Sequence, residues 1–214
     1  MKNIFLSLLL MLFVGATIAQ SDDKSQKILD QLSKDIKALN TFTIDFSLQI
    51  KNATTGENES QKGSGTVKGN KFFAELEDNL IISNGMKIWT VVKSEKVTYE
   101  SDADDEDEEA INPKKLMTIW EKGFKNKYVG EQAVGGKKMH VINLFPIKPA
   151  EAQYHTISLF IDVASNDLHR AEMKMKDGTK MTYTILKMNK NVDVDNAKFV
   201  YDARKFPGFQ LIRD

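Results

Sequence analysis

The residue types that most often carry catalysis are sparse in this sequence. Cysteine is absent, and the three histidines, His140, His155 and His169, show no H-x-x-x-H spacing that could hold a metal ion. Gly63-Ser64-Gly65 only superficially resembles the elbow that carries a nucleophilic serine, because it opens a predicted strand and does not join a strand to a helix. We therefore expect no enzyme, no metal site and no cofactor.

A block of like charge is the other candidate for chemistry. Residues 101–109 read Ser-Asp-Ala-Asp-Asp-Glu-Asp-Glu-Glu, which could bind calcium or dock a basic partner. The block lacks the glycine and the terminal glutamate spacing of an EF-hand loop, so a solvated, disordered loop is the favoured interpretation. Asn112-Pro113 then caps a predicted short helix whose apolar residues are Leu116, Met117, Ile119 and Trp120.

The composition limits the function further. With 214 residues the chain is long enough for one domain with its own core. Lysine plus arginine and aspartate plus glutamate both number 30, so no net charge attracts nucleic acid or an anionic membrane. Without cysteine the protein forms no disulfides and carries no thioether-linked lipid of its own.

The first 19 residues have the pattern of an export signal. Lys2 supplies the positive end, residues 4–14 are almost entirely apolar, and Ala16-Thr17-Ile18-Ala19 offers small side chains for cleavage after Ala19. A membrane anchor is the alternative, but the apolar run is too short for a comfortable span. We divide the chain into a signal peptide, residues 1–19, and one domain, residues 20–214.

One strand organises the predicted domain. Residues 41–50 alternate strictly between apolar and polar side chains, which predicts a strand with a single apolar face. A helix over residues 22–40 is the nearest cover for that face, because apolar residues recur in it at helical spacing, at Leu29, Leu32, Ile36 and Leu39. The two elements predict a curved sheet around an apolar interior, with helices over it.

Turn signals divide the rest of the chain into further strands. A second strand is predicted from residue 63 to about residue 76, with Gly69-Asn70 marking a bulge or bend inside it. Later hairpins are predicted at Asn84-Gly85, Gly135-Gly136, Asn166-Asp167 and Asp177-Gly178. Because each hairpin connects neighbours in sequence, the sheet is predicted to be antiparallel and mostly a meander.

This order of elements resembles the family of periplasmic outer-membrane lipoprotein carriers (LolA-like proteins) over essentially the whole mature chain. The residues that carry the resemblance are, in order, Phe42-x-x-x-Phe46, Gly63-Ser64-Gly65, residues 83–89, Asn112-Pro113 with Leu116-Met117, residues 159–162, Asp177-Gly178, Phe199-Val200-Tyr201 and residues 206–209. No single element is specific, but their order is.

The resemblance implies a mainly β (α+β) fold: a strongly curved, incompletely closed antiparallel β-barrel with a helical lid over an apolar cavity. It also implies a monomeric periplasmic chaperone that binds the acyl chains of lipoproteins and carries them from the inner to the outer membrane. The implied partners are acylated lipoproteins, the inner-membrane lipoprotein-releasing ABC transporter and an outer-membrane lipoprotein receptor. Covering one chain of about sixteen carbons avoids on the order of 12 kcal/mol of apolar exposure to water, which a cavity can supply without catalytic groups.

Large apolar residues form the candidate ligand-binding set. Alternation or position in the family's pattern selects Phe42, Phe46, Leu48, Phe72, Phe73, Ile82, Trp89, Leu116, Met117 and Trp120. Any one of them taken alone is better explained as ordinary core, because large apolar side chains are usually buried, so only the set is informative. Met173, Met175 and Met181 could line an adaptable pocket or fill gaps in the core.

One departure from the family's pattern concerns the lid. Many members carry an Arg-Pro pair just after the Gly-x-Gly strand begins, and the arginine takes part in lid closure and release. Residues 67–71 of this chain read Val-Lys-Gly-Asn-Lys. Lys68 or Lys71 is the available donor to lid carbonyls, although an ammonium lacks the planar fork of a guanidinium.

Two functions of other classes stay open. A lipid- or lipoprotein-sensing binding module of envelope stress signalling would use the acidic block to dock a basic partner. A hydrolase acting on lipid or envelope polymers is disfavoured, because its nucleophile and metal motifs are missing. Bound lipid without turnover separates a carrier from a hydrolase, and transfer of cargo to a receptor separates a carrier from a sensor.

Overall fold

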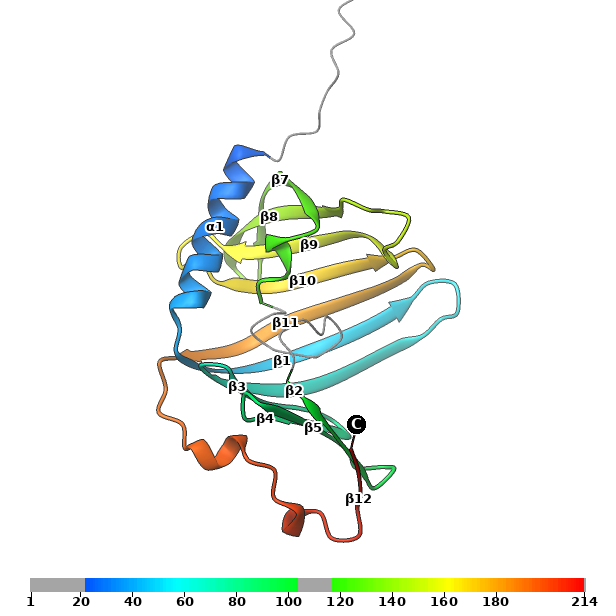
Figure 1. The fold of residues 1–214 in the computed structure, drawn as a ribbon. Coiled ribbons are helices and arrows are strands. Elements are labelled where there is room, and N and C mark those ends of the chain that lie inside the picture. The colour runs from blue at the N-terminus through cyan, green and yellow to red at the C-terminus, as the bar shows by residue number, and fades with distance from the viewer. Residues whose placement is uncertain (1–21, 104–116, 214) are drawn as a thin grey trace, which may run out of the picture.

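The computed structural model describes residues 22–103 and 117–213, so the predicted signal peptide lies outside the described residues. Within them the chain forms one long helix, a twelve-stranded sheet and short 3-10 helices (Figure 1). The helices are α1 (Asp23–Ala38), η1 (Ile119–Glu121), η2 (Asn196–Phe199) and η3 (Ala203–Lys205). The strands are β1 (Thr41–Asn52), β2 (Asn58–Lys68), β3 (Lys71–Leu76), β4 (Asn79–Ser83), β5 (Lys87–Val92), β6 (Val97–Asp102), β7 (Phe124–Val134), β8 (Lys137–Pro146), β9 (Tyr154–Asp162), β10 (Leu168–Met175), β11 (Thr179–Lys190) and β12 (Gln210–Arg213).

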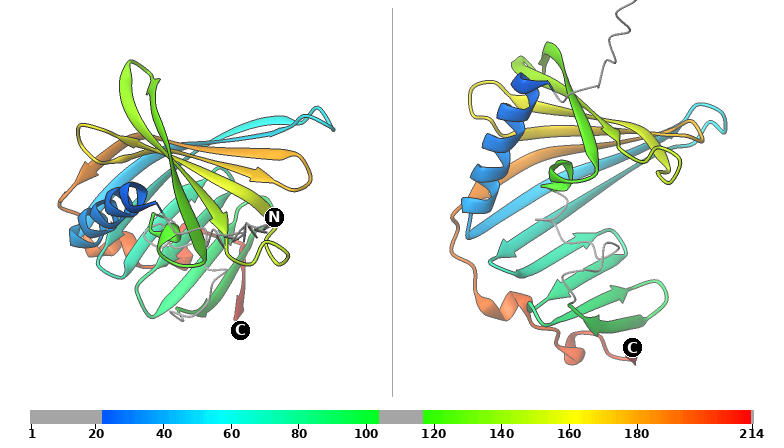
Figure 2. Two further views of the ribbon diagram at one scale, coloured as in Figure 1. Left: turned by 90° about the horizontal axis from the view of Figure 1, so that it is seen from above. Right: turned by 45° about the horizontal axis from the view of Figure 1, so that its top comes forward.

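The strands form one curved sheet that ends at β12 on one side and at β7 on the other. Their order is β12-β6-β5-β4-β3-β2-β1-β11-β10-β9-β8-β7. Neighbours are antiparallel, except that β12 runs parallel to β6. Figure 2 shows how strongly the sheet bends. The prediction of a mainly β, antiparallel and incompletely closed sheet is confirmed, as are the hairpins at the four predicted dipeptides.

Helix α1 lies within the predicted range of residues 22–40 and packs as its sequence predicts. The Oδ1 atom of Asp22 accepts a hydrogen bond of 2.9 Å from the backbone N–H of Lys24, which caps the first turn. The apolar stripe of the helix packs in one core with β1, and its fully buried members are Leu29, Leu32 and Ile36. Figure 1 shows α1 lying across the strands. The predicted contact between the helix and the strand that follows it is therefore confirmed.

Gly69-Asn70 is the turn of a hairpin, and the prediction of a bulge inside one long strand was wrong. β2 ends at Lys68 and pairs antiparallel with β3, which begins at Lys71. Gly69 has φ +60°, a left-handed conformation that suits glycine, and its N–H donates to the Asn40 carbonyl at 2.8 Å. Thr66-Val67 precedes the turn and Phe72-Phe73 follows it. All four residue types suit a strand, so the local pattern did not reveal the reversal.

The region of the acidic block also differs from its prediction. Ser101 and Asp102 end strand β6, which the sequence did not predict. Residues 104–109, Asn112-Pro113 and Leu116 lie outside the described residues. Of the predicted short apolar helix, the structure describes Met117, Thr118 and the three-residue 3-10 helix η1.

The C-terminal segment, residues 191–213, covers the outside of the sheet. Figure 1 shows it in orange and red beneath β3, β4 and β5. Three of its aromatic residues, Tyr201, Phe206 and Phe209, pack on a small core made by Leu80, Ile82 and Val91. The sheet is therefore packed on both faces: α1 covers the concave face and the C-terminal segment covers part of the convex face.

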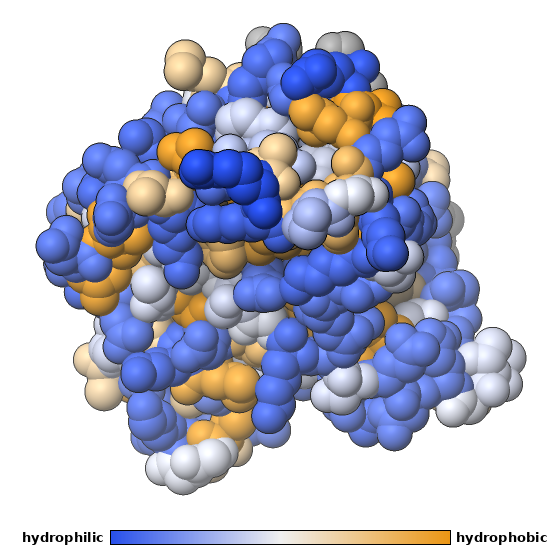
Figure 3. Space-filling model, turned by 90° about the horizontal axis from the view of Figure 1, so that it is seen from below, coloured by the Kyte–Doolittle hydropathy of each residue, from blue (hydrophilic) through white to orange (hydrophobic). Residues whose placement is uncertain are grey.

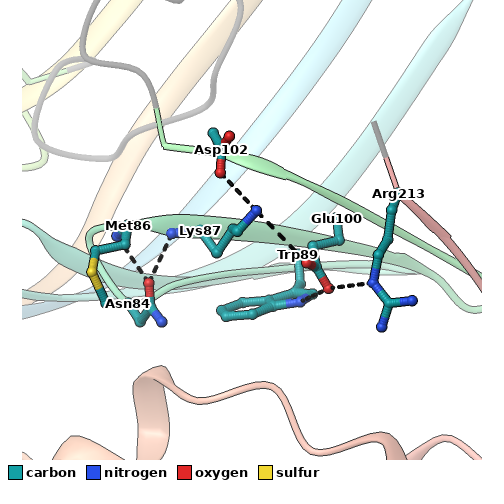
Figure 4. Close-up of polar contacts among 7 residues, drawn as sticks. All are labelled: Asn84, Met86, Lys87, Trp89, Glu100, Asp102 and Arg213. Atoms are coloured by element: carbon teal, nitrogen blue, oxygen red, sulfur yellow. Dashed lines mark hydrogen bonds and ion pairs between the residues drawn. The ribbon is translucent and has the colours of Figure 1, made fainter.

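A polar cluster fixes the end of the chain to the sheet (Figure 4). Glu100 of β6 receives a hydrogen bond from Nε1 of Trp89 at 3.1 Å, and the guanidinium Nε of Arg213 in β12 lies 3.4 Å from the same carboxylate. Lys87 pairs with Asp102 at 2.7 Å. In the preceding turn, Oδ1 of Asn84 accepts the N–H groups of residues 86 and 87, which shapes the β4–β5 hairpin.

Candidate functional site

The strand register builds a continuous apolar surface on the concave face. One row across five strands consists of Leu48, Tyr183, Ala171, Leu159 and Ile142. A second row consists of Ile50, Met181, Met173, Ile157 and Leu144. Directly opposed residues point to the same face, so each row lies on one side of the sheet. Both rows include members of the core that contains the α1 stripe, which places them on the side that α1 covers.

This surface extends beyond the fully buried core. Phe46 and Ile185, which oppose each other in β1 and β11, are half-buried, as are Met173 and Met181. Burial raises the pKa of the Tyr154 phenol, which packs at the margin of the same core, as expected where water is scarce. The concave face therefore offers half-buried apolar side chains, two of them the adaptable thioethers predicted from the sequence.

The predicted ligand-binding residues fall on two faces of the sheet. Four of them are buried together in the concave core, namely Phe42, Phe72, Met117 and Trp120. Phe46 packs against this core. Leu48 is buried in the first concave row. Ile82 belongs to the convex core, against which Phe73 and Trp89 pack. Leu116 lies outside the described residues.

Sequence reasoning missed the largest contribution to the concave face, which comes from β8 and β9. Its residues are Ile142, Leu144, Ile157, Leu159 and Ile161. A period-two apolar pattern from residue 157 to residue 161 was the available signal. Both faces of β9 are buried, however, and such strands read as continuous apolar runs that do not indicate which face binds.

Polar side chains fasten the first turn of α1 to β7. The Ser25 hydroxyl donates to Oδ1 of Asn126 at 2.5 Å, and Nδ2 of Asn126 donates to Oε1 of Gln26 at 2.7 Å. Ser25 is fully buried and Asn126 is nearly so. The contacts satisfy polar groups that would otherwise be buried without partners, and they fix one end of the helix.

A second group of contacts, here named the η1 latch, holds the C-terminal half of α1. The indole Nε1 of Trp120 donates to Oγ of Ser33 at 2.9 Å, and Nζ of Lys37 lies 2.7 Å from Oε2 of Glu121. Burial disfavours ionisation of Glu121, but hydrogen bonds from Lys37 and Ser33 outweigh it and lower the pKa. A hollow of about 530 Å³ with largely polar walls lies along this seam between α1 and η1.

The η1 latch is expected to weaken in acid. A carboxylate with a lowered folded-state pKa stabilises the fold above its unfolded pKa of about 4.3, and the stabilisation is lost as the pH falls through the folded value. Amide hydrogen exchange in α1, corrected for intrinsic rates, should therefore accelerate relative to β9 as the pH drops below about 4.3. The Glu121→Gln variant should lose this relative change, and an unchanged pH dependence would contradict the assignment.

Gly63 makes room for the ring of Phe46. A Cβ atom at residue 63 would lie 2.5 Å from Cζ of Phe46 and 2.7 Å from the Glu75 carbonyl oxygen. Gly63→Ala is therefore expected to lower the free energy of unfolding by about 1–3 kcal/mol, because the ring and the β3 backbone must both shift. Urea unfolding measures the loss, with Ser64→Ala on the opposite face as the control. Equal stability of the two variants would show that the close approach is not required.

The Lys68 side chain hydrogen-bonds to the C-terminal segment, and not to helix α1. Its Nζ atom donates to the Val194 carbonyl at 2.6 Å and so fastens the start of the C-terminal segment to β2. One of the two predicted alternatives to the family's lid arginine is therefore engaged elsewhere, and the prediction for Lys71 stays untested. Within residues 22–103 and 117–213, side-chain donors to α1 include Trp120 of η1 and Asn126 of β7.

The described part of the chain contains no group of three His, Asp or Glu residues placed to hold a metal ion. Glu172, which follows His169 by three residues, pairs with Lys180 at 2.7 Å. None of the helices in the described ranges is long and apolar enough to cross a membrane.

The fold and the site together define a class of protein in which an open, curved antiparallel sheet presents an apolar concave face covered by one helix. The chain belongs to the outer membrane lipoprotein carrier protein LolA family, whose sequence model matches residues 15–179. The recognition made from the order of sequence elements is confirmed.

Individual relatives are distant. The chain is 26% identical over 206 residues to the uncharacterized protein MJ0687 of Methanocaldococcus jannaschii, covering 93% of this chain but only 58% of that protein. A crystal structure of an uncharacterized conserved protein from Thermus thermophilus is similar with a TM-score of 0.58 at 11% identity, over 89% of this chain and 99% of that chain. The LolA superfamily protein NE2245 from Nitrosomonas europaea gives a TM-score of 0.43 at 12% identity, over 82% and 97% of the two chains. The similarity to the Thermus structure shows that the same fold occurs in another protein.

Proposed function

We propose that this protein is a periplasmic carrier that binds the acyl chains of lipoproteins on its concave face and takes them from the inner to the outer membrane. The observation that carries the proposal is the continuous apolar surface formed by the two cross-strand rows under α1. Membership of the carrier family supports it. The expected partners are an inner-membrane lipoprotein-releasing ABC transporter as donor and an outer-membrane receptor as acceptor.

The packing of α1 suggests how cargo enters. The helix places Leu29, Leu32 and Ile36 on the concave core, so this closed form buries its own apolar stripe. An acyl chain can replace these contacts with equivalent ones, because burial of apolar surface is non-directional. We therefore infer that α1 acts as a lid that exchanges places with cargo, a step in which few net apolar contacts are lost.

The contacts of the lid favour reversible opening. The Trp120–Ser33 hydrogen bond stabilises the closed form by about 0.5–1.5 kcal/mol, the usual net value for a hydrogen bond between neutral groups. The Lys37–Glu121 pair is largely solvent-exposed on its lysine side and adds little. The latch therefore adds only a modest free energy to the closed form, beside the apolar stripe and the Ser25–Asn126 contact.

Removing the latch hydrogen bond is expected to increase lid opening without emptying the core. Trp120→Phe keeps an aromatic ring and deletes the indole donor, so α1 amides should exchange about tenfold faster, equivalent to ~1.4 kcal/mol. Trp89→Phe is the matched control, because it deletes the indole bond to Glu100 on the opposite face. Faster α1 exchange in both variants, or in neither, would contradict the latch.

A transfer assay tests the carrier function. Donor vesicles carrying a fluorescent palmitoylated lipopeptide are mixed with the protein and with unlabelled acceptor vesicles. The proposal requires a soluble protein–lipopeptide complex and delivery that increases with protein concentration. Stable capture without delivery would favour the sensing module, and chemical cleavage of the lipopeptide would favour a hydrolase.

A further inference from the structure

A small apolar pocket lies on the opposite face of the sheet from the proposed lid. It has a volume of about 160 Å³ and is enclosed between the sheet and the C-terminal segment. Its floor is formed by Phe73, Leu80 and Ile82, which belong to the convex core or pack against it. The concave core contains Phe72, and adjacent strand residues point to opposite faces, so the sheet itself separates this pocket from the concave site.

The pocket has the size and lining of a site for a small apolar group. A cavity of about 150 Å³ lined by aliphatic and aromatic side chains is sufficient for a ligand as large as benzene. Val200 also lines the pocket and is 56% exposed, so part of the apolar lining is accessible from solvent. Figure 3 views the molecule from below and shows separate apolar areas surrounded by hydrophilic side chains.

The charges at the opening favour an anion. Lys198 and Lys205, from η2 and η3, both line the pocket, and Nζ of Lys198 lies 4.7 Å from the centre of the Phe73 ring. The carboxylate of Asp202 also lies there, but it is bound by Arg204 through both oxygens, at 2.9 and 3.0 Å. Arg204 thus offsets the acidic group, and the side chains of Lys198 and Lys205 give the pocket lining a net positive charge.

We propose that this pocket binds the aliphatic tail of a free single-chain anionic amphiphile, a carboxylate of the fatty-acid type, with the headgroup held between Lys198 and Lys205. The apolar floor takes the first several carbons of the tail, and the two short helices present the cations. The proposal goes beyond lipoprotein carriage, because it concerns a different face of the sheet and a ligand that is not attached to protein. It neither requires the lid nor depends on the concave site.

Methyl NMR distinguishes the two faces directly. The purified protein, with labelled Ile, Leu and Val methyl groups, is titrated with butanoate, hexanoate and octanoate below their aggregation concentrations. The methyl signals of Leu80, Ile82 and Val200 should shift in a saturable manner, whereas those of Ile142 and Leu159 report the concave face. Affinity should rise from butanoate to hexanoate and then level off, because the pocket holds only a short stretch of chain.

Two kinds of variant complete the test. Ala197→Leu places a larger side chain in the pocket wall and should weaken octanoate binding at least about tenfold, whereas Ala203→Leu, an exposed alanine in η3 outside the lining, should not. The Lys198→Gln/Lys205→Gln double variant should weaken octanoate but leave hexanol unchanged. Shifts confined to Ile142 and Leu159, or insensitivity to Ala197→Leu, would overturn the proposal. Binding to anionic phospholipid vesicles without any response to octanoate would replace it by membrane docking.

Discussion

Changing Phe46 to aspartate is expected to abolish retention of acyl chains. Phe46 is half-buried on the concave face and packs against the main core, so the change removes an aromatic contact and places a carboxylate on the apolar surface. The affinity for a palmitoylated lipopeptide should fall at least about a hundredfold, which corresponds to ~2.7 kcal/mol. Fluorescence titration with a labelled lipopeptide measures the loss.

The neighbouring residue provides the control. Ser47→Asp introduces the same charge one position along the same strand, where the side chain points to the opposite face of the sheet. It should leave lipopeptide affinity within about threefold of the original value, which is ~0.6 kcal/mol. Urea unfolding of both variants confirms that each is folded. Equal losses in both would show that the concave face is not the binding surface.

The largest expected loss of stability follows from Phe42→Ala. Phe42 has no exposed surface and lies where α1, β1 and β2 meet in the concave core, opposite Val67. Truncating a fully buried phenylalanine lowers the free energy of unfolding by about 3–5 kcal/mol, because a cavity remains. For a domain of this size the melting temperature should fall by about 10 °C, since each kcal/mol shifts it by roughly 2–4 °C.

A matched truncation at the surface separates core packing from a general effect of losing a ring. Phe145→Ala removes the same atoms from β8, where the phenylalanine is 37% exposed, and should reduce stability by no more than about 1.5 kcal/mol. Thermal unfolding followed by circular dichroism compares the two variants. A loss below about 1.5 kcal/mol for Phe42→Ala would mean that the concave core is loosely packed.

Much of the fold could be predicted because its determinants are local. The helical spacing from Leu29 to Leu39 and the turn dipeptides act within a few residues. The Gly69-Asn70 hairpin was misread because a glycine inside a predicted strand is compatible with both a bend and a reversal. Strand β12 escaped prediction because its parallel pairing with β6 joins segments more than a hundred residues apart, and four residues carry no periodicity.

The candidate site was predicted less well, for a physical reason. Alternation identifies which residues share a face, so adjacent Phe72 and Phe73 could have been assigned to opposite faces from the sequence alone. It does not identify which face is concave, because that depends on the curvature of the whole sheet. Trp89 and Ile82 were therefore grouped with Phe42, although they form the second core on the convex face.

The latch was not predictable from the sequence. Serine and lysine are common on helix surfaces, so Ser33 and Lys37 do not stand out in the sequence. Glu121 is one charged residue among many. Their roles arise only because η1 is brought back against α1 after an interval of more than eighty residues. Residues that fasten the helix to the sheet are therefore found from the structure, whereas the helix itself can be found from its periodicity.

Native mass spectrometry of the protein purified from the periplasm tests the central claim most directly. The account predicts a stoichiometric complex with acylated lipoprotein that is lost in Phe46→Asp and retained in Ser47→Asp. A protein that is always empty, and that acquires no lipoprotein from donor membranes even when Trp120→Phe has freed the lid, would contradict it.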